Sequence, residues 1–399
     1  MVMLNKIKSA FAKNLYLSLT IAAFAMFIGC GKETGPIAEP KPVVDTDPGN
    51  SGYTHIFKSN EGGYTCFRIP AIIKTKAGTL LAFAEGRKTG CGDEGDIDMV
   101  VKSSADKGKT WSALRVIWSD GENTCGNPAP VVDETTGKIH LLMTWNLGTD
   151  DIGTINNGTS KDTRRVFKTA STDDGQTWES PKEITADVKL AAWGWYATGP
   201  CHGIQISKGT YKGRLVIPCD NIETGAGRKG YSHVIYSDDN GEKWKLGGVT
   251  PPISVNPNES TVAELADGRL ILNMRVSNNN NLRMKSISAD GGLTWSTPVD
   301  AASLVDPVCQ GSIINSTIGG QHTLFFSNPS SITRTNMTIK MSIDDGVTWP
   351  KAYSVYTGMS SYSDLVMIEA NQIGILYEAG LTRYSEGIAF KTVNASDFK

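Results

Sequence analysis

The sequence predicts an all-β fold, specifically a six-bladed β-propeller of four-stranded antiparallel blades. Two observations support this prediction: an eight-residue pattern occurs five times, and pairs of apolar, strand-like runs occur six times. The 399-residue chain also contains 42 glycines and 9 tryptophans, which suits a β protein with many tight turns. Long stretches with helical periodicity are hard to find. We therefore expect one large repeat domain over residues 52–399.

The eight-residue pattern, which we call the box, is S-x-D-x-G-x-T-W. Its Asp side chain can accept backbone N–H bonds and close a turn, its Gly can adopt backbone angles that other residues avoid, and its Trp can pack inward. The copies lie at 104–111, 171–178, 237–244 (with Lys243 in place of threonine), 288–295 and 342–349. Five copies indicate a repeated supersecondary unit, in which the box aspartates have a structural role.

Two apolar, strand-like runs occur in each repeated unit. The second runs of the six units lie at 79–84, 139–145, 215–218, 270–274, 324–326 and 373–377. Each follows another short strand-like run, such as FRIPAIIK, GPCHGIQI or YSDLVMIE, and each of the first five is followed by a box. The unit therefore consists of strand, strand, strand, box and strand, as in a propeller blade.

The strand order also predicts which residues share a face. In an up-and-down blade, the second strand ends at the face where the first strand starts, and the box lies at the opposite face. Residues at the starts of first strands, and at or after the ends of second strands, should therefore converge. The former are Arg68, Asn127, His202, Glu259, Gln310 and Tyr362, and the latter are Arg87, Asp93, Arg275 and Arg334.

The N-terminal residues predict export. Residues 1–29 are typical of a signal peptide, because three lysines precede an uncharged apolar run at 15–28. The run ends in Gly-Cys, which resembles a bacterial lipobox and predicts Cys30 as the lipid-bearing first residue; plain secretion is the alternative. Residues 30–51 contain four prolines and are expected to form an extended linker. We expect an exported lipoprotein of the periplasm, outer membrane or cell surface, with the lipid as its only membrane contact.

Charge and cysteine content limit the classes of partner. Without residues 1–29, 36 basic residues face 41 acidic ones, so the mature charge is about −5, which argues against nucleic acid. An anionic ligand would need local arginines. Six further cysteines are too dilute for a disulfide scaffold, although a bridge between Cys91 and Cys125 is conceivable. No CxxC pair or histidine ligand spacing occurs, so we expect no zinc.

Together these features resemble the bacterial exo-sialidase (neuraminidase) family, from about residue 53 to the end. The motif FRIP, the five boxes (the family's Asp boxes) and the spaced arginines carry the resemblance. It implies that Arg68, Arg275 in LILNMR and Arg334 in NPSSITRTNMT form a carboxylate-binding triad. Guanidinium groups suit this task, because they grip a planar carboxylate in paired bonds and stay charged.

The resemblance also implies the catalytic residues. Tyr362 would be the nucleophile, Glu259 its base partner, and Asp93 the acid/base. Sialic acid carries a carboxylate on its anomeric carbon, so a neutral phenol suits this position, whereas an anionic nucleophile would be repelled. The alternatives for these roles are Tyr377, Asp96 and Asp98.

Further pocket residues follow from the same resemblance. Arg87 would bind a ring hydroxyl, while Asn127, Trp195, Tyr196 and Gln310 would line the acyl-amino and glycerol pockets. We expect a monomeric exo-α-sialidase that needs no metal or organic cofactor and has no separate lectin domain. It would release terminal sialic acid from sialylated glycans or glycoconjugates with retention, through a tyrosyl intermediate. The alternatives are a catalytically silent sialic-acid-binding propeller and a trans-sialidase.

Overall fold

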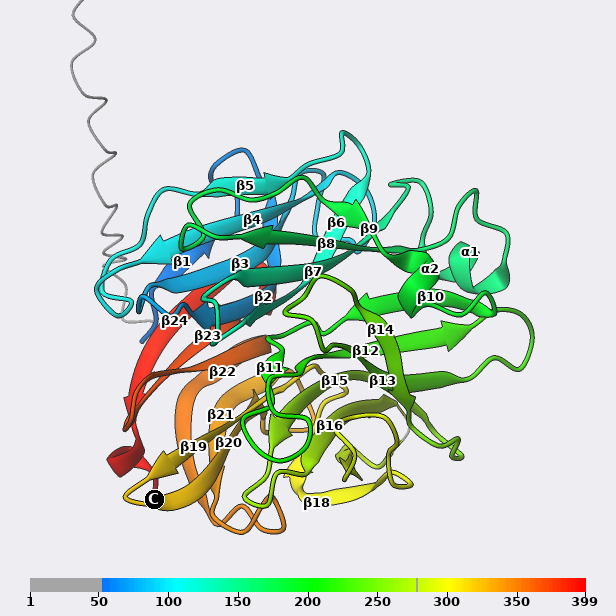
Figure 1. Ribbon diagram of the computed structural model, residues 1–399. Coiled ribbons are helices and arrows are strands. Elements are labelled where there is room, and N and C mark those ends of the chain that lie inside the picture. Colours follow the sequence, from blue (N-terminus) through cyan, green and yellow to red (C-terminus); the bar gives the residue numbers. More distant parts are fainter. Residues whose placement is uncertain (1–51, 278) are drawn as a thin grey trace, which may run out of the picture. The chain divides into compact units, whose positions relative to one another are not determined.

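The computed structural model describes residues 52–277 and 279–399, which form an all-β domain (Figure 1). The predicted signal peptide, Cys30 and the linker lie outside these residues. The helices are short: α1 (Ile152–Asn157), α2 (Thr185–Val188), and the 3-10 turns η1 (Tyr384–Glu386) and η2 (Ala395–Asp397). Within the described part of the chain, no helix has the length and hydropathy needed to cross a membrane.

The described strands form four sheets, of eight, five, four and seven strands. Their pairs are antiparallel apart from one parallel pair, Ile97 with Thr124, which connects β4 to β6 within the eight-stranded sheet. We divide the strands in chain order into six units that follow the predicted repeat, most of them with four strands. The first two units comprise β2 (Cys66–Lys74), β3 (Leu80–Arg87), β4 (Ile97–Ser104) and β5 (Arg115–Trp118), then β6 (Thr124–Val132), β7 (Ile139–Asn146), β8 (Arg165–Ser171) and β9 (Lys182–Glu183). The next two comprise β10 (Trp193–Thr198), β11 (Ile204–Gln205), β12 (Leu215–Glu223), β13 (Gly230–Ser237) and β14 (Lys245–Val249), then β15 (Asn256–Glu264), β16 (Leu270–Ser277), β17 (Leu282–Ser288) and β18 (Val299–Val305). The last two comprise β19 (Ser312–Ile318), β20 (Gln321–Pro329), β21 (Thr335–Ser342) and the first half of β22 (Lys351–Glu369), then its second half, β23 (Gln372–Gly380), β24 (Gly387–Asn394) and β1 (His55–Lys58).

Two of these units depart from the predicted order. In the sixth unit the outer strand is β1, from the start of the described chain, which pairs antiparallel with β24. In the third unit the first strand is broken: β10 and β11 both pair with β12, and residues 199–203 between them are not in a strand. The prediction of a continuous strand through GPCHGIQI was therefore wrong.

The second strands were predicted in the right places but too short. The run predicted at 215–218 continues as β12 to Glu223, and the run predicted at 324–326 lies within β20, Gln321–Pro329. A strand was assumed to end with its apolar run. The pairing nevertheless continues through buried polar residues such as Asp220 and Asn221, which lie opposite Ala197 and Tyr196 of β10.

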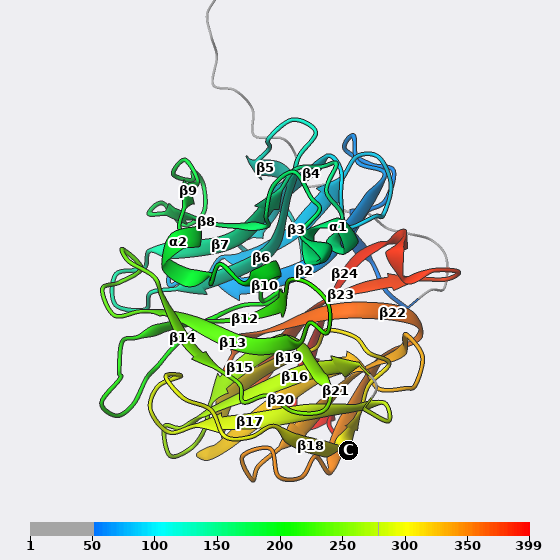
Figure 2. The ribbon, with the colours of Figure 1, turned by 90° about the vertical axis from the view of Figure 1, so that its right-hand side faces the viewer.

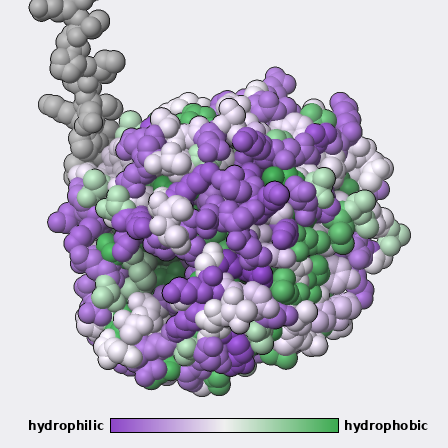
Figure 3. Space-filling model, viewed as in Figure 1, coloured by the Kyte–Doolittle hydropathy of each residue, from purple (hydrophilic) through white to green (hydrophobic). Residues whose placement is uncertain are grey.

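Apolar residues seal the joints between neighbouring units. Leu142 of β7 packs in one cluster with Ile217 of β12, and Ile271 of β16 packs in another with Phe326 of β20. Figure 2 shows the units as successive layers of strands, turned from the view of Figure 1. The outer face seen in Figure 3 is mostly hydrophilic, with small scattered apolar groups. The apolar residues of the strands are thus used mainly for packing one unit on the next.

The five boxes share one hydrogen-bonded structure, as predicted. In the fourth, Ser288 Oγ donates to Asp290 Oδ1 (2.7 Å), and Asp290 accepts from the backbone N–H and the hydroxyl of Thr294 (2.9 and 2.6 Å). Gly292 has φ +88°, in the left-handed region that favours glycine. The Trp295 side chain is buried. The box aspartates therefore close turns.

The strand registers place the boxes away from the predicted site residues. In the first unit, Ser104 at the start of the box lies opposite Leu80, while Arg87 lies at the other end of β3. In the fourth unit, Ser288 lies opposite Leu270, whereas Arg275 follows toward the other end of β16. The prediction that boxes and arginines occupy opposite ends is confirmed in these units.

Asp364 joins the first strands of several units. Its buried carboxylate accepts hydrogen bonds from Ile72 N (2.9 Å), His202 Nδ1 (2.7 Å) and Ser312 Oγ (2.7 Å), which belong to three other units. Asp364 lies two residues after Tyr362 on β22, just beyond an irregularity in the strand pairing between Ser360 and Ser363. The carboxylate thereby holds the segment that carries Tyr362.

Candidate active site

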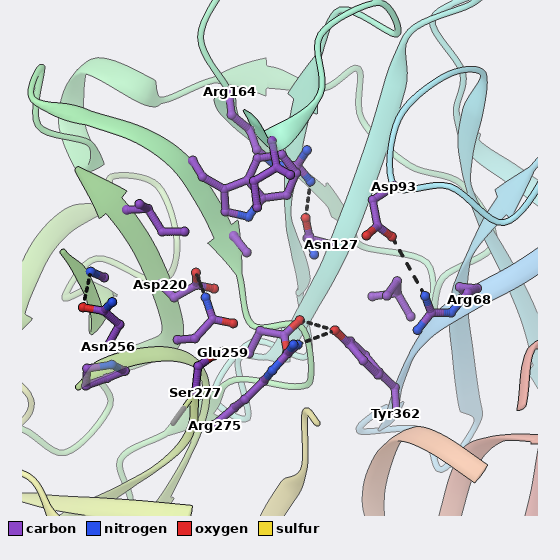
Figure 4. A pocket seen from close by; sticks show the side chains of 18 of the residues that line it. Arg68, Asp93, Asn127, Arg164, Asp220, Asn256, Glu259, Arg275, Ser277 and Tyr362 are labelled. Atoms are coloured by element: carbon purple, nitrogen blue, oxygen red, sulfur yellow. Dashed lines mark hydrogen bonds and ion pairs between the residues drawn. The ribbon is translucent and has the colours of Figure 1, made fainter. Parts of the chain in front are cut away.

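A cavity of about 530 Å³ collects residues from β2, β3, β6, β10, β12, β15, β16 and β22 (Figure 4). Nine of the predicted site residues line it: Arg68, Arg87, Asp93, Asn127, Trp195, Glu259, Arg275, Arg334 and Tyr362. The sequence analysis predicted that residues at the starts of first strands and at the ends of second strands converge. The cavity contains such residues, which are spread over almost 300 positions of the chain. We describe them below from the arginines outward.

Arg68 is held from behind by a buried carboxylate. Its Nε and Nη2 donate to the two oxygens of Glu378 at 2.9 and 3.1 Å, in a bidentate pair. Burial alone would lower the pKa of Arg68, but the charge of Glu378 raises it above its usual value. The remaining nitrogen, Nη1, lies 3.9 Å from Asp93 Oδ1 across the cavity. Arg68 is therefore a fixed cation with one nitrogen directed at the cavity.

Tyr362, Glu259 and Arg275 form one hydrogen-bonded group. The Tyr362 hydroxyl donates to Glu259 Oε1 at 2.6 Å, and Arg275 Nη1 donates both to Glu259 Oε2 (2.6 Å) and to the Tyr362 oxygen (2.9 Å). Burial, and next the charge of Glu259, raises the pKa of Tyr362 well above its usual value. The phenol is therefore neutral at neutral pH, with a carboxylate placed to take its proton.

The predicted arginine triad surrounds Tyr362. The guanidinium carbons of Arg68 and Arg334 lie 5.1 and 5.8 Å from the centre of the Tyr362 ring, and Arg275 contacts its hydroxyl. Arg334 is positioned by bonds to Ser361 Oγ (3.1 Å) and to the carbonyl oxygen of Val308 (3.2 Å). A planar anion bound by these arginines would lie beside the phenol oxygen.

Arg87 links Asp93 to the wall of the cavity. Its Nε donates to Glu85 Oε2 at 3.0 Å on one side, and its Nη1 forms a 2.8 Å ion pair with Asp93 Oδ1 on the other. Burial raises the pKa of Asp93, but the charges of Arg87 and Arg68 outweigh it and hold the pKa below its usual value. In the free site, Asp93 is thus an ionised partner of two arginines.

Asn127 and Arg164 form the side of the cavity nearest α1. Asn127 has φ +54°, and its backbone N–H donates to Glu85 Oε1 at 2.7 Å. Its side-chain oxygen accepts from Arg164, whose guanidinium carbon lies 3.9 Å from the Trp195 ring centre. Burial lowers the pKa of Arg164 to about 10, so it remains charged at neutral pH. This side offers a cation stacked on an indole.

Two predicted pocket residues do not line the cavity. Tyr196 is fully buried against Trp193 and His233, and its strand neighbours Trp195 and Ala197 face the cavity instead, because side chains alternate along a strand. Gln310 is also buried. Its amide donates to the carbonyl oxygen of Pro200 (2.9 Å), and its oxygen accepts from Ser363 N (3.0 Å), so it braces the Tyr362 strand.

The alternative residues also lie elsewhere. Tyr377 is fully buried in an apolar cluster of the last units, as packing would require. Asp98 accepts from the Tyr64 hydroxyl (2.7 Å) and pairs with Lys88 (3.1 Å), and Asp96 pairs with the same lysine (2.8 Å). These two aspartates therefore hold the base of the loop that carries Asp93. His202, expected at the site, instead faces Asp364.

The disulfide differs from the bridge considered from the sequence. Cys91 is bonded to Cys66, with 5.4 Å between their Cα atoms, and Cys125 is a free, buried cysteine. Cys66 begins β2 and lies opposite Arg87 at the end of β3, so the loop after β3 returns over it. The idea of a Cys91–Cys125 bridge was wrong, because the sequence does not reveal this return.

Three acids at the site were not singled out from the sequence: Glu85, Asp220 and Glu378. Each lies near the pocket end of a second strand, as Arg87 and Arg275 do, so the same rule applied to every unit would have found them. Asp220 Oδ2 accepts from Asn258 (3.0 Å), while its buried Oδ1 has no partner among the described residues. Burial, and next the charge of Glu259, raises the pKa of Asp220 well above its usual value. The cavity thus contains two aspartates whose pKa values are shifted in opposite directions: that of Asp93 is lowered and that of Asp220 is raised.

Among the residues that the structure describes, no group of three or more His, Cys, Asp or Glu side chains has the arrangement of a metal site.

Comparisons with known proteins identify the family of this chain. Residues 78–375 match the family model of the BNR repeat-like domain. The chain is 33% identical to a sialidase of Bacteroides fragilis, over 83% of this chain and 62% of that protein. It is also 33% identical to an exo-alpha-sialidase of Aspergillus fumigatus, over 71% of this chain and 69% of that one. The chain therefore spans less than two thirds of the length of the Bacteroides fragilis relative.

A solved structure of a sialidase is similar to this chain in both fold and sequence. The Hadza microbial sialidase Hz136 superposes with a TM-score of 0.78 at 32% identity, covering 86% of this chain and 68% of that one. The fold and the site thus define a BNR repeat-like protein with an arginine-rich cavity. Within that class, the chain belongs to the sialidase family.

Proposed function

We propose that the protein is an exo-α-sialidase, a retaining glycoside hydrolase that releases terminal sialic acid from glycoconjugates through a tyrosyl intermediate. The hydrogen-bonded group of Tyr362, Glu259 and Arg275 carries this proposal, because it pairs a neutral phenol with a carboxylate that can take its proton. The names of the relatives support the substrate class. A catalytically silent binding protein would have no need of this arrangement.

The first step forms the covalent intermediate. The three arginines bind the substrate carboxylate, and the Tyr362 oxygen attacks the anomeric carbon while its proton passes to Glu259. The glycosidic C–O bond breaks, and the leaving oxygen takes a proton from Asp93. Arg275 bonds both Tyr362 and Glu259, so it fixes their geometry as the charge moves.

The second step reverses the roles. Asp93 removes a proton from a water molecule, whose oxygen attacks the anomeric carbon on the face that the leaving group has left. The bond to Tyr362 breaks, and the phenol regains its proton from Glu259. Two displacements at one carbon give net retention. A sugar hydroxyl in place of water would give transfer, so product analysis distinguishes hydrolysis from trans-sialidase activity.

Substrate binding prepares Asp93 to act as an acid. In the free site, Arg87 and Arg68 lower the pKa of Asp93 and favour its ionised form. A substrate carboxylate at Arg68 adds a negative charge beside Asp93 and partly neutralises that arginine. Both effects raise the pKa of Asp93 toward the value that proton donation needs.

We also propose that the six units close into a six-bladed propeller. Contacts between first strands support a ring: β2 contacts β6, β6 contacts β10 and β11, β11 contacts β15, β15 contacts β19, β19 contacts β22, and β22 contacts β2. Pairing of β1 with β24 would join the two ends of the domain. Deletion of residues 1–58, which include β1, tests the closure, because it should lower the melting temperature sharply without removing any residue that lines the cavity.

We further propose that the mature protein is an exported, monomeric lipoprotein anchored through Cys30. The pattern of residues 1–30 in the sequence motivates this. Metabolic labelling with a fatty acid should mark the wild type and not a Cys30→Ala variant. Labelling of neither would contradict the anchor, and a mass above that of one chain in solution would contradict the monomer.

Turnover of a fluorogenic sialoside tests the activity. The wild type should hydrolyse it, and Tyr362→Phe should lower kcat more than about a hundredfold, because the residue that forms the covalent bond is lost. Undiminished turnover by Tyr362→Phe would exclude this nucleophile. No turnover of any sialoside by the wild type would favour a binding protein.

A further inference from the structure

The loop that carries Asp93 is covalently tied to the strand that carries Arg68. Residues 88–96 connect β3 to β4, and within them Cys91 is bonded to Cys66, with 5.4 Å between the Cα atoms. Cys91 lies two residues before Asp93, and Cys66 lies two residues before Arg68. The disulfide therefore joins the proposed general acid to the carboxylate-binding strand over a very short path.

Arg87 provides a second tie to the same loop. Its Nη1 donates to the carbonyl oxygens of Cys91 (2.6 Å) and Gly92 (2.7 Å), and it forms the 2.8 Å ion pair with Asp93. These ties converge on residues 91–93. Other bonds hold the ends of the loop: Thr65 Oγ1 donates to the carbonyl oxygen of Lys88 (2.6 Å), and Thr124 Oγ1 donates to that of Gly95 (2.9 Å). The disulfide and Arg87 instead act on the middle of the loop, where Gly92 and Asp93 are exposed.

The two ties differ in their dependence on ionisation. The ion pair between Arg87 and Asp93 exists only while Asp93 is ionised, but proton donation requires the protonated form. The ion pair is thus weakest in the form that reacts, and of the Arg87 tie only the bonds to the carbonyl oxygens of Cys91 and Gly92 then remain. The disulfide does not depend on the ionisation of Asp93, so it can hold the loop in both forms.

We propose that the Cys66–Cys91 disulfide positions Asp93 for protonation of the leaving group. The inference rests on the sialidase activity proposed above. Cys66 and Cys91 are positioning residues, since they act through the loop and not on the substrate. Protonation of a poor leaving group depends on the bridge, whereas binding of the substrate carboxylate by the arginines does not.

Substrates with different leaving groups distinguish positioning of Asp93 by the disulfide from stabilisation of the whole fold. A 4-nitrophenol group departs with little help from an acid, whereas a sugar hydroxyl needs a proton. In Cys91→Ala, we expect kcat/KM for sialyl-lactose to fall about tenfold or more, and that for 4-nitrophenyl sialoside less than about threefold. The melting temperature of each variant is measured, and the assays are run well below it. Equal losses on both substrates, or no loss on either, would overturn the proposal.

Two further variants sharpen the test. Cys125→Ala removes a buried free cysteine of β6 and should leave the ratio of the two activities unchanged. Asp93→Asn should show the same selective loss, and adding Cys91→Ala to it should cost little more on sialyl-lactose, because both changes remove one function. Fully additive losses would contradict the proposal.

The double variant Cys66→Ala/Cys91→Ala gives a second measurement without an unpaired thiol, and the same selective loss is expected. Failure of both bridge variants to fold even at 10 °C would overturn the proposal, since the bridge would then be a folding requirement. No turnover of either substrate by the wild type would instead contradict the sialidase activity itself.

Discussion

The hydroxyl group of Tyr362 donates a 2.6 Å hydrogen bond to Glu259, a residue 103 positions earlier in the chain. Glu259 lies on β15 of the fourth unit, and Tyr362 lies on the half of β22 that pairs in the sixth. The pair therefore exists only when the units are packed together. Stability and activity are coupled here through the elements that hold β15 and β22.

Removing the charge of Glu378 should weaken both folding and substrate binding. In Glu378→Gln, buried Arg68 loses its bidentate carboxylate partner, and breaking such a buried pair costs about 3 kcal/mol of unfolding free energy. KM for a sialoside should rise, because Arg68 no longer has a fixed orientation. Chemical denaturation and steady-state kinetics measure the two effects. Glu369→Gln, at an exposed ion pair, is the control and should change neither; equal behaviour of the two variants would contradict the account.

Replacing Arg87 should shift the pH profile of the reaction. The charge of Arg87 lowers the pKa of Asp93, so Arg87→Gln should raise that pKa. Because an acid must be protonated in the substrate complex, the alkaline limb of the kcat profile for sialyl-lactose should move to higher pH, even though the maximum of kcat falls. Lys88→Gln, in the same loop but paired with Asp96 and Asp98, should leave the limb in place. A limb that stays in place in Arg87→Gln would rule out Asp93 as the acid.

The box aspartates should matter for stability and not for turnover. Asp290→Ala removes the acceptor of several turn hydrogen bonds and should lower the unfolding free energy by about 1–3 kcal/mol. The kcat of the folded fraction should stay unchanged, because the box lies at the end of its unit away from Arg275. Asp267→Ala, at an exposed turn, should cost less than about 0.5 kcal/mol. A large drop in kcat for Asp290→Ala would contradict the assignment of the two ends.

The pair of His202 and Asp364 should make stability depend on pH. Burial lowers the pKa of His202, but the charge of Asp364 outweighs this and raises it above its usual value. A raised pKa in the folded state gives stabilisation that is present below pH of about 6.5 and is lost as the pH rises through the folded value. Asp364→Asn should remove this decline. Urea denaturation between pH 5 and 9 measures it, and parallel curves for the two proteins would show that His202 makes no such contribution.

Much of the fold could be predicted from the sequence because it is repetitive. The boxes fix where third strands end, and the strand order then placed Arg68, Arg275 and Arg334 at the other end, where the structure brings them to Tyr362. This inference needed only connectivity, which is local information in an up-and-down unit.

The rest depended on details that local patterns do not contain. Trp195 and Tyr196 are neighbours in one strand, and which of them faces the cavity depends on a register that two adjacent aromatics do not reveal. The partner of Cys91 depends on how the loop after β3 returns over β2. In the sequence, Glu378 directly follows an apolar run and gives no sign of a partner. Its role as the hydrogen-bond acceptor of Arg68 becomes visible only in the folded structure.

The central claim is that Tyr362 becomes covalently bonded to the sugar, and trapping the intermediate tests it most directly. A 3-fluorosialosyl fluoride should inactivate the wild type. The fluorine at C3 slows both the formation and the hydrolysis of the intermediate, but fluoride is a good leaving group, so formation stays fast enough for the intermediate to accumulate. Mass spectrometry of the digested protein should then find one fluorosialosyl group on the peptide that contains Tyr362, and none in Tyr362→Phe. A label on Glu259 or Asp93, or continued turnover without any label, would contradict the account.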